Sequence, residues 1–243
     1  MPLLKGGRTL YGLALGVLML DTRMPRLPGD VGNAETWPFP AHYAVVKGAN
    51  TSRIMGPDPD PTLLEPFIAA ACELQRLGVR AITTSCGFLA VFQKELQAEL
   101  AVPMLSSALL QVPYVSRVID PGKRVAILTE RPNLTERHYN GVGWSANDIP
   151  VTVCAMPDGA VFPKVFIDQS VTADRDVLER EMVDLAVRAA KEPGVGALVL
   201  ECTNFVPFSQ AMRRATGLPV YDLYTLVMHT YLATSAPEFP RGP

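Results

Sequence analysis

The chain repeats itself, and this repeat constrains its fold more than any other feature. Residues 78–106 align without a gap with residues 194–222, which lie 116 positions later in the 243-residue chain. Six of the 29 aligned positions are identical, among them Cys86 with Cys202, and the apolar pattern agrees at several others. A duplication of this kind fixes the architecture before local structure is assigned. We therefore expect two similar halves.

Each half alternates predicted strands with predicted helices. Short apolar runs predict buried strands, and longer runs with apolar residues every three or four positions predict helices. The predicted strands are residues 13–20, 42–47, 81–84 and 104–105 in the first half and 124–128, 151–155, 197–200 and 220–221 in the second. Helices are predicted at residues 62–77, 174–191 and 223–234 and after Cys86 and Cys202. This alternation is typical of an α/β fold with parallel sheets covered on both faces.

The repeat also suggests a division into two similar parallel-sheet α/β domains. The strand near residue 220 corresponds to the one near residue 104, so the simplest arrangement returns it and the final helix to the first domain. We expect the first domain at residues 1–118 plus 217–243 and the second at residues 119–216, with the active site in the cleft between them. The proline-rich residues 236–243 are predicted to form a poorly ordered tail.

Composition excludes several classes of protein. The chain has 22 basic and 24 acidic residues, 48% hydrophobic residues and 19% charged residues, which is neither the polarity of a disordered chain nor the basic excess of a nucleic-acid-binding protein. No apolar run reaches the length of a membrane span, and no small-residue cleavage site follows the apolar residues 10–20. We expect a cytoplasmic protein with reduced thiols that binds neither nucleic acid nor membranes.

Two of the four cysteines stand where ligands bind. Cys86 and Cys202 follow buried strands of the repeat at the start of helices, and ligands of parallel sheets bind outside the carboxyl ends of strands. The helix dipole lowers the pKa of a thiol in that position. Two facing thiols could take a proton from one face of a carbon and return one to the other. Cys72 and Cys154 are interpreted as small core residues, and the spacing of the four cysteines predicts no metal site.

The segments around these two cysteines resemble a known family. TTSCGF around Cys86 and ECTNFVPF around Cys202, in a duplicated chain of this length, resemble the aspartate/glutamate racemase superfamily, whose members include hydantoin racemase, maleate isomerase and arylmalonate decarboxylase. The resemblance implies a cofactor-independent enzyme in which both cysteines act as bases. It also implies that the residues beside them hold the substrate carboxylate, namely Ser85, Gly87, Phe88, Thr203 and Asn204.

Two departures from the family pattern bear on the substrate. Amino-acid racemases of the family usually read Cys-Asn-Thr at the first cysteine, where this chain has Gly87 and Phe88. Their second motif tends to continue with His or Glu, where this chain has Asn204. These differences point away from free glutamate or aspartate as the substrate.

The loops after the first strand of each half supply further candidates for substrate contacts. Asp21 ends the first strand, and Asn33 closes a Gly/Pro-rich loop suited to a lid. Thr129 and Arg131 occupy the matching place in the second half, where an arginine could grip a carboxylate with two N–H bonds.

These observations predict a racemase or epimerase that inverts the carbon next to a carboxylate or carbonyl. The substrate is expected to be a small carboxylate or a cyclic imide, amino-acid-like or hydantoin-like, and the protein is expected to form a homo-oligomer. Two alternatives stay open. One is a cysteine-dependent isomerase or decarboxylase of a small dicarboxylic acid, and the other is a non-catalytic protein that binds small acids.

Overall fold

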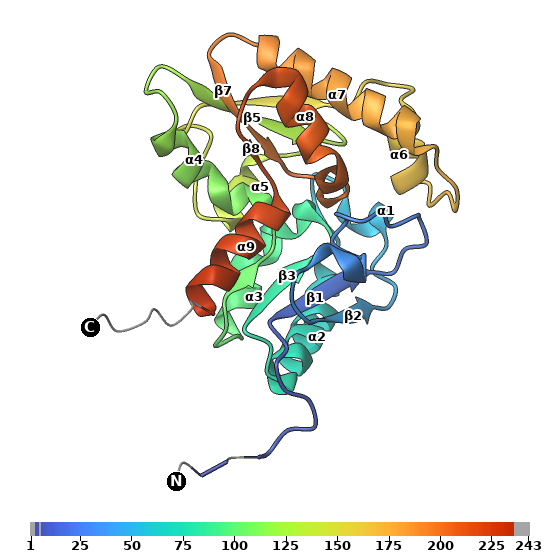
Figure 1. The fold of residues 1–243 in the computed structure, drawn as a ribbon, viewed down its shortest axis with the longest axis vertical. Coiled ribbons are helices and arrows are strands. Elements are labelled where there is room, and N and C mark those ends of the chain that lie inside the picture. The colour runs from blue at the N-terminus through green and yellow to red at the C-terminus, as the bar shows by residue number, and fades with distance from the viewer. Residues whose placement is uncertain (1–2, 5, 236–243) are drawn as a thin grey trace, which may run out of the picture.

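The chain folds into two four-stranded parallel sheets, one in each half (Figure 1). The computed structural model describes residues 3–4 and 6–235. The first sheet has the strand order β2-β1-β3-β4 and the second has the order β6-β5-β7-β8. The second order repeats the first with each strand number raised by four, so the predicted duplication and the α/β fold class are confirmed.

The strands lie close to their predicted positions. In the first half they are β1 (Leu15–Leu20), β2 (Ala41–Val46), β3 (Ala81–Thr84) and β4 (Met104–Leu105). In the second half they are β5 (Arg124–Thr129), β6 (Val151–Ala155), β7 (Val195–Leu200) and β8 (Val220–Tyr221). All of their pairings are parallel, and the two central strands of each sheet, β1 with β3 and β5 with β7, are buried almost throughout.

The helices include several that periodicity did not predict. Those in predicted regions are α2 (Leu64–Leu77), α3 (Gln93–Ala98), α7 (Arg175–Lys191), α8 (Ser209–Thr216) and α9 (Leu223–Thr234). The others are α1 (Thr51–Ile54), α4 (Val112–Val118), α5 (Glu136–Gly141) and α6 (Val161–Phe166). The latter four have at most seven residues each, too few turns for an apolar stripe to stand out in the sequence.

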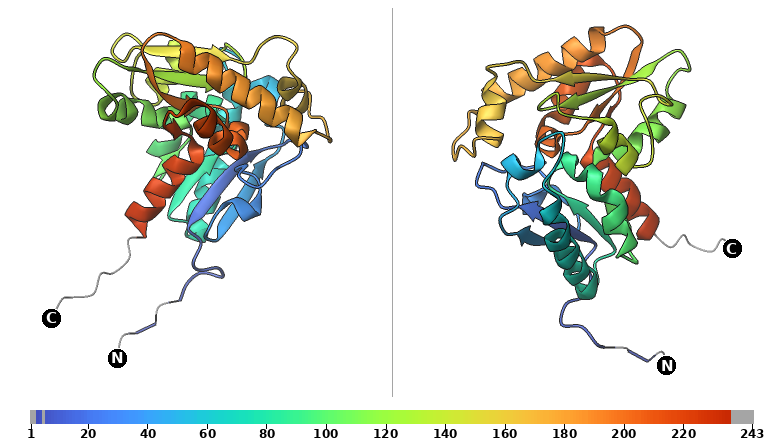
Figure 2. Two further views of the ribbon diagram at one scale, coloured as in Figure 1. Left: turned by 45° about the horizontal axis from the view of Figure 1, so that its top comes forward. Right: turned by 180° about the vertical axis from the view of Figure 1, so that it is seen from behind.

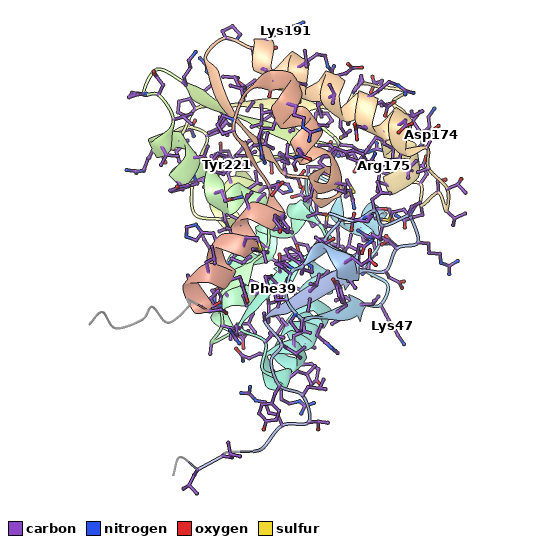
Figure 3. The ribbon with its side chains drawn as sticks, viewed as in Figure 1. Phe39, Lys47, Asp174, Arg175, Lys191 and Tyr221 are labelled. Atoms are coloured by element: carbon purple, nitrogen blue, oxygen red, sulfur yellow. The ribbon has the colours of Figure 1, made fainter. Side chains whose placement is uncertain are left out.

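Each sheet is covered on one face by helices of its own half. Seen from behind, α2 covers the outside of the first half and α7 that of the second (Figure 2). Phe67 and Leu74 of α2 pack on the first sheet, and Leu178 and Leu185 of α7 pack on the second. Figure 3 marks the two ends of α7 by Asp174, whose side chain caps the helix by accepting from the backbone of Asp176 and Val177, and by Lys191.

The other face of each sheet is covered by a helix from across the repeat. Val112 and Val115 of α4 pack against β5 and β7 of the second sheet. Leu223 and Val227 of α9 pack on the first sheet. Phe39, which is labelled in Figure 3, stacks on Tyr231 of α9 with 4.1 Å between ring centres. The two halves have therefore exchanged their last helices.

This exchange separates two elements that we expected to stay together. The final helix returns to the first sheet as expected, but β8 pairs with β7 in the second sheet, so the expectation that residues 220–221 join the first domain is wrong. The short α8 is long enough to bring β8 back beside β7, just as α3 brings β4 beside β3. The chain crosses between halves only after the fourth strand. The domain boundaries themselves stay a prediction, and the predicted tail lies outside the described residues.

None of the helices formed by the described residues combines the length and the apolar character needed to cross a lipid bilayer.

Candidate active site between the two halves

Both predicted cysteines line one small cavity at the boundary between the halves. Its volume is about 20 Å³, enough for roughly one water molecule. The lining from the first half is Leu20, Met24, Arg26, Thr51, Met55, Ser85, Cys86, Gly87 and Phe88, and from the second half Glu130, Phe166, Glu201, Cys202, Thr203 and Asn204. The structure thus brings together seven of the eleven predicted site residues.

The repeat places each cysteine in the same local structure. Cys86 follows β3 and precedes a 3₁₀ helix at Gly87–Phe92, and Cys202 follows β7 and precedes a 3₁₀ helix at Thr203–Phe208. A hydrogen bond joins the two motifs, because the hydroxyl of Thr203 donates to the carbonyl oxygen of Ser85 over 2.8 Å. The two thiols are therefore held in one cavity by a direct link between the halves.

The environment of the thiols differs from the one we expected. Burial raises the pKa of the Cys86 thiol well above its usual range, and the negative charge of Glu201 raises it further, although backbone N–H groups of the following helix favour the thiolate. Burial likewise raises the pKa of Cys202, and the neighbouring Glu130 adds to the effect. Our expectation that the helix start lowers these pKa values is wrong, because loss of water outweighs the hydrogen bonds from backbone N–H groups at the helix start.

Two glutamates beside the cysteines complete the site, and the motifs did not single them out. The Cys202 thiol donates to Oε2 of Glu130 at 3.8 Å, and the Thr129 hydroxyl donates to Oε2 of Glu201 at 2.7 Å. Burial and the charge of Glu201 raise the pKa of Glu130 to about 8. Burial raises the pKa of Glu201 to about 7, against the hydrogen bond from Thr129. Both groups can therefore exchange protons near neutral pH.

Glycine at position 87 makes room for one of these glutamates. A Cβ atom on Gly87 would overlap the backbone oxygen and the carboxyl oxygen Oε1 of Glu201. The side chain of Glu201 thus approaches the first cysteine from the other half of the chain. This contact gives a physical reason for the departure from the family's Cys-Asn-Thr pattern, since asparagine does not fit beside Glu201.

The Gly/Pro-rich loop of the first half reaches the second cysteine. The side-chain amide of Asn204 donates to Oδ2 of Asp30 over 2.8 Å, and Arg26 forms an ion pair with Oδ1 of the same carboxylate at 2.8 Å. Asp30 is buried, and Met24 of the same loop packs into the core of the second half. The loop therefore closes one side of the cavity.

The remaining four predicted site residues lie outside the cavity lining. Asp21 accepts from the backbone of Gly48, and Asn33 caps the short helix that follows it. Thr129 lies behind Glu201, which it holds by the hydrogen bond described above. Arg131 is exposed and borders a second, more open hollow that also reaches Glu130. Their roles in binding stay predictions.

A signal for the glutamates was present in the sequence. Glu201 follows the apolar strand Val195–Leu200 directly, and Glu130 follows β5, so each carboxyl group ends a buried strand. Glutamate is rarely fully buried unless it is paired, so a glutamate at the end of a buried strand is unusual. Within the described part of the chain, no group of three or more His, Cys, Asp or Glu side chains is placed to hold a metal ion.

Comparison with known proteins identifies the family. Residues 46–230 match the model of the family described as Asp/Glu/Hydantoin racemase. The chain is 31% identical over 222 residues to a dimethylsulfoniopropionate lyase of Durusdinium sp. clade D, with 86% of this chain and 71% of that protein covered. It is 29% identical over 219 residues to dimethylsulfoniopropionate lyase 3 of Emiliania huxleyi (strain CCMP1516), of which it spans 57%, with 87% of this chain covered.

Solved structures of similar fold include enzymes of several activities. Allantoin racemase from Klebsiella pneumoniae superposes with a TM-score of 0.60 at 16% identity, covering 94% of this chain and 96% of that one. Unliganded arylmalonate decarboxylase gives 0.60 at 16% identity, covering 92% and 93%. Glutamate racemase from Bacillus anthracis gives 0.55 at 16% identity, covering 92% and 83%. At this identity the likeness concerns the fold, while the family match spans most of the chain. The chain belongs to the Asp/Glu/Hydantoin racemase family.

Proposed function

We propose that this protein is a lyase that cleaves dimethylsulfoniopropionate or a closely similar onium carboxylate. The observation that carries the proposal is the cavity in which two thiols and two buried carboxyl groups meet. The names of the similar lyases supply the substrate. This substrate has a carboxylate at one end and, on the β-carbon, a dimethylsulfonium group that is a good leaving group.

The reaction we propose is an elimination started by a thiolate. The thiol of Cys202 gives its proton to Oε2 of Glu130, which lies 3.8 Å away. The thiolate then removes a proton from the carbon next to the substrate carboxylate, and the electrons of that C–H bond form a C=C bond. The bond between the β-carbon and sulfur breaks with its electrons going to sulfur. The products are acrylate, dimethyl sulfide and one proton. Cys202 ends as a thiol that holds the proton from the substrate, and Glu130 releases to solvent the proton that it took from Cys202.

Arg26 is proposed to bind the substrate carboxylate. It is the cationic side chain among the cavity-lining residues of the described chain, and its Nη1 and Nη2 atoms are fixed by Asp30 and Thr22 at 2.8 Å each. A guanidinium held in this way stabilises the charge that builds up on the carboxylate as the neighbouring carbon loses its proton.

The test is release of dimethyl sulfide from dimethylsulfoniopropionate by the purified protein, measured by gas chromatography. We expect Cys202→Ser to lose at least about a hundredfold in kcat, since a hydroxyl is a far weaker acid than a thiol. Cys86→Ser should lose less, because one base suffices for an elimination. A wild-type protein that releases no dimethyl sulfide would reject the proposal, and a fully active Cys202→Ser would reject the assigned base.

The second candidate is the racemase predicted from the sequence. It is favoured by the presence of both thiols in one cavity, since inversion needs a base on each face of the carbon. Chiral amino acids and hydantoins incubated in D₂O would gain deuterium in both enantiomers, and replacing either cysteine by serine would abolish racemisation. Retention of optical rotation across such a series would exclude this candidate.

A further inference from the structure

Two carboxyl groups in the cavity wall are buried without a complete set of partners. Glu130 is 3% exposed and Glu201 is 1% exposed. Both side chains line the cavity, and the Oε1 atom of each has no hydrogen-bond partner among the described residues. Buried polar atoms are nearly always paired, so two unpaired carboxyl oxygens at one cavity indicate a binding role.

No cation in the described part of the chain neutralises these carboxyl groups at contact distance. Among the residues that the structure describes, no lysine, arginine or histidine forms an ion pair with Glu130 or Glu201. Arg26 is already paired with Asp30. Arg131 favours the ionised form of Glu130, but it acts from the exposed side. Burying such groups costs several kcal/mol in general, a cost that a bound cation would offset.

The chain is also shaped around one of the carboxyl groups. Gly87 leaves space beside Cys86 that Oε1 of Glu201 occupies. Thr129 holds the other oxygen of Glu201 at 2.7 Å, and the unpaired oxygen lies against Gly87, the residue after the first cysteine. This contact between Gly87 and Glu201 is an observation separate from the burial of the two carboxyl groups.

The rest of the lining suits a cation that carries methyl groups. Met24, Met55, Phe88 and Phe166 contribute thioether and aromatic surfaces to the same cavity. Sulfonium and quaternary ammonium ions have no N–H donors and present methyl groups, so they bind to apolar and aromatic surfaces with carboxylates nearby. A primary ammonium ion would instead need three acceptors.

We propose that Glu130 and Glu201 form a subsite for the cationic group of the substrate and make the protein selective for onium carboxylates. The inference rests on the proposed function, since it assigns the sulfonium end of that substrate. The zwitterion would lie between the glutamates and Arg26, with its acidic C–H bond between the charged ends, and the one-water cavity would have to open to admit it. The bound cation would also favour the ionised carboxyl groups, so that Glu130 can accept the proton of Cys202 once the substrate is bound.

The test compares two unreactive ligands of the same shape. These are 3-(trimethylammonio)propionate and 4,4-dimethylpentanoate, which differ in the charge of one atom. Their dissociation constants are measured by isothermal titration calorimetry on the full chain. We expect the wild-type protein to prefer the cation by at least about tenfold. Glu201→Gln and Glu130→Gln should each remove most of this preference, because each should weaken the binding of the cationic ligand and leave that of the neutral-tailed ligand unchanged.

A matched control is Glu99→Gln, because Glu99 is exposed and is not among the cavity-lining residues. This variant should keep the wild-type preference. Equal affinity of the wild-type protein for both ligands would overturn the subsite, whether or not the variants fold. So would glutamine variants that weaken both ligands equally, since that result would mean that the carboxyl groups only shape the cavity.

The same measurements separate this inference from the proposed function. A preference for the cation in a protein that releases no dimethyl sulfide would keep the subsite and reject the lyase. Release of dimethyl sulfide without any preference would keep the lyase and reject the subsite.

Discussion

At the residue scale, Gly87 decides how closely the two halves can meet at the first cysteine. Its backbone needs no left-handed conformation, so the requirement for glycine comes from contact with Glu201 alone.

We expect Gly87→Ala to push Glu201 and Cys86 apart and to lower kcat/KM by about a hundredfold, as displacements near 1 Å do in other active sites. Release of dimethyl sulfide measures the loss. Gly122→Ala, in an exposed turn with a nearest contact of 3.4 Å, should leave activity unchanged. An active Gly87→Ala would show that the contact relaxes freely.

Arg26 offers a second prediction at this scale. If its guanidinium holds the substrate carboxylate, Arg26→Gln should raise KM for dimethylsulfoniopropionate by roughly tenfold or more, because a charge-assisted contact is lost. The KM for dimethylsulfoniopropionate and the dissociation constant of 4,4-dimethylpentanoate should rise together, since both ligands carry the carboxylate. An unchanged affinity for this neutral-tailed ligand would place the carboxylate elsewhere in the cavity.

At the element scale, the exchanged helix α9 is capped at its N-terminus by a buried carboxyl group. Asp222 caps α9 by accepting from the backbone of Thr225 over 2.8 Å, and it also accepts from Ser209 at the start of α8. We expect Asp222→Ala to reduce the free energy of unfolding by about 2 kcal/mol, since it removes a cap and leaves a buried hydroxyl unpaired. Urea unfolding measures this. Asp174→Ala, at the exposed cap of α7, should reduce the free energy of unfolding by only about 1 kcal/mol. Equal reductions in the two variants would mean that the hydrogen bond from Ser209 to Asp222 adds no stability.

The elements also show how far the sequence alone could lead. Four of the eight strands and α9 begin and end where the apolar pattern predicts, because buried strands and amphipathic helices carry that pattern in consecutive residues. The two cysteines and their neighbours could be found from the repeat. The crossing of α4 and α9 could not, since local periodicity says which face of a helix is apolar but not which sheet it covers. The place of Glu201 in the site likewise depends on the space left by Gly87, which is 114 residues away in the chain, so local sequence could not reveal it.

At the scale of the whole molecule, the buried glutamates make stability depend on pH. Burial raises the pKa of Glu130 to about 8 and of Glu201 to about 7, whereas in the unfolded chain both titrate near 4.5. Between pH 6.5 and 8.5 the folded protein therefore holds protons that the unfolded chain has released. Stability must fall as pH rises through this window, by on the order of 2 kcal/mol. Burial lowers the pKa of His138 to about 4, so this group changes stability below the window instead.

Urea unfolding at pH 6.5, 7.5 and 8.5 tests this dependence. Glu130→Gln removes the group with the larger shift and should flatten most of the slope, while Glu99→Gln should keep it. A wild-type protein equally stable at all three values would mean that water reaches the glutamates in the folded state.

The exchange of final helices bears on how such a chain could arise. A half-length ancestor would have ended in a helix corresponding to α4 or α9, which in this structure covers the sheet of the other half. Two copies of that ancestor would have traded these helices as a symmetric, domain-swapped pair. Fusion of two gene copies would then have turned an exchange between molecules into a crossing within one chain. On this account, Cys86 and Cys202 descend from a single cysteine of the ancestor, which the twofold axis of the dimer placed once in each half.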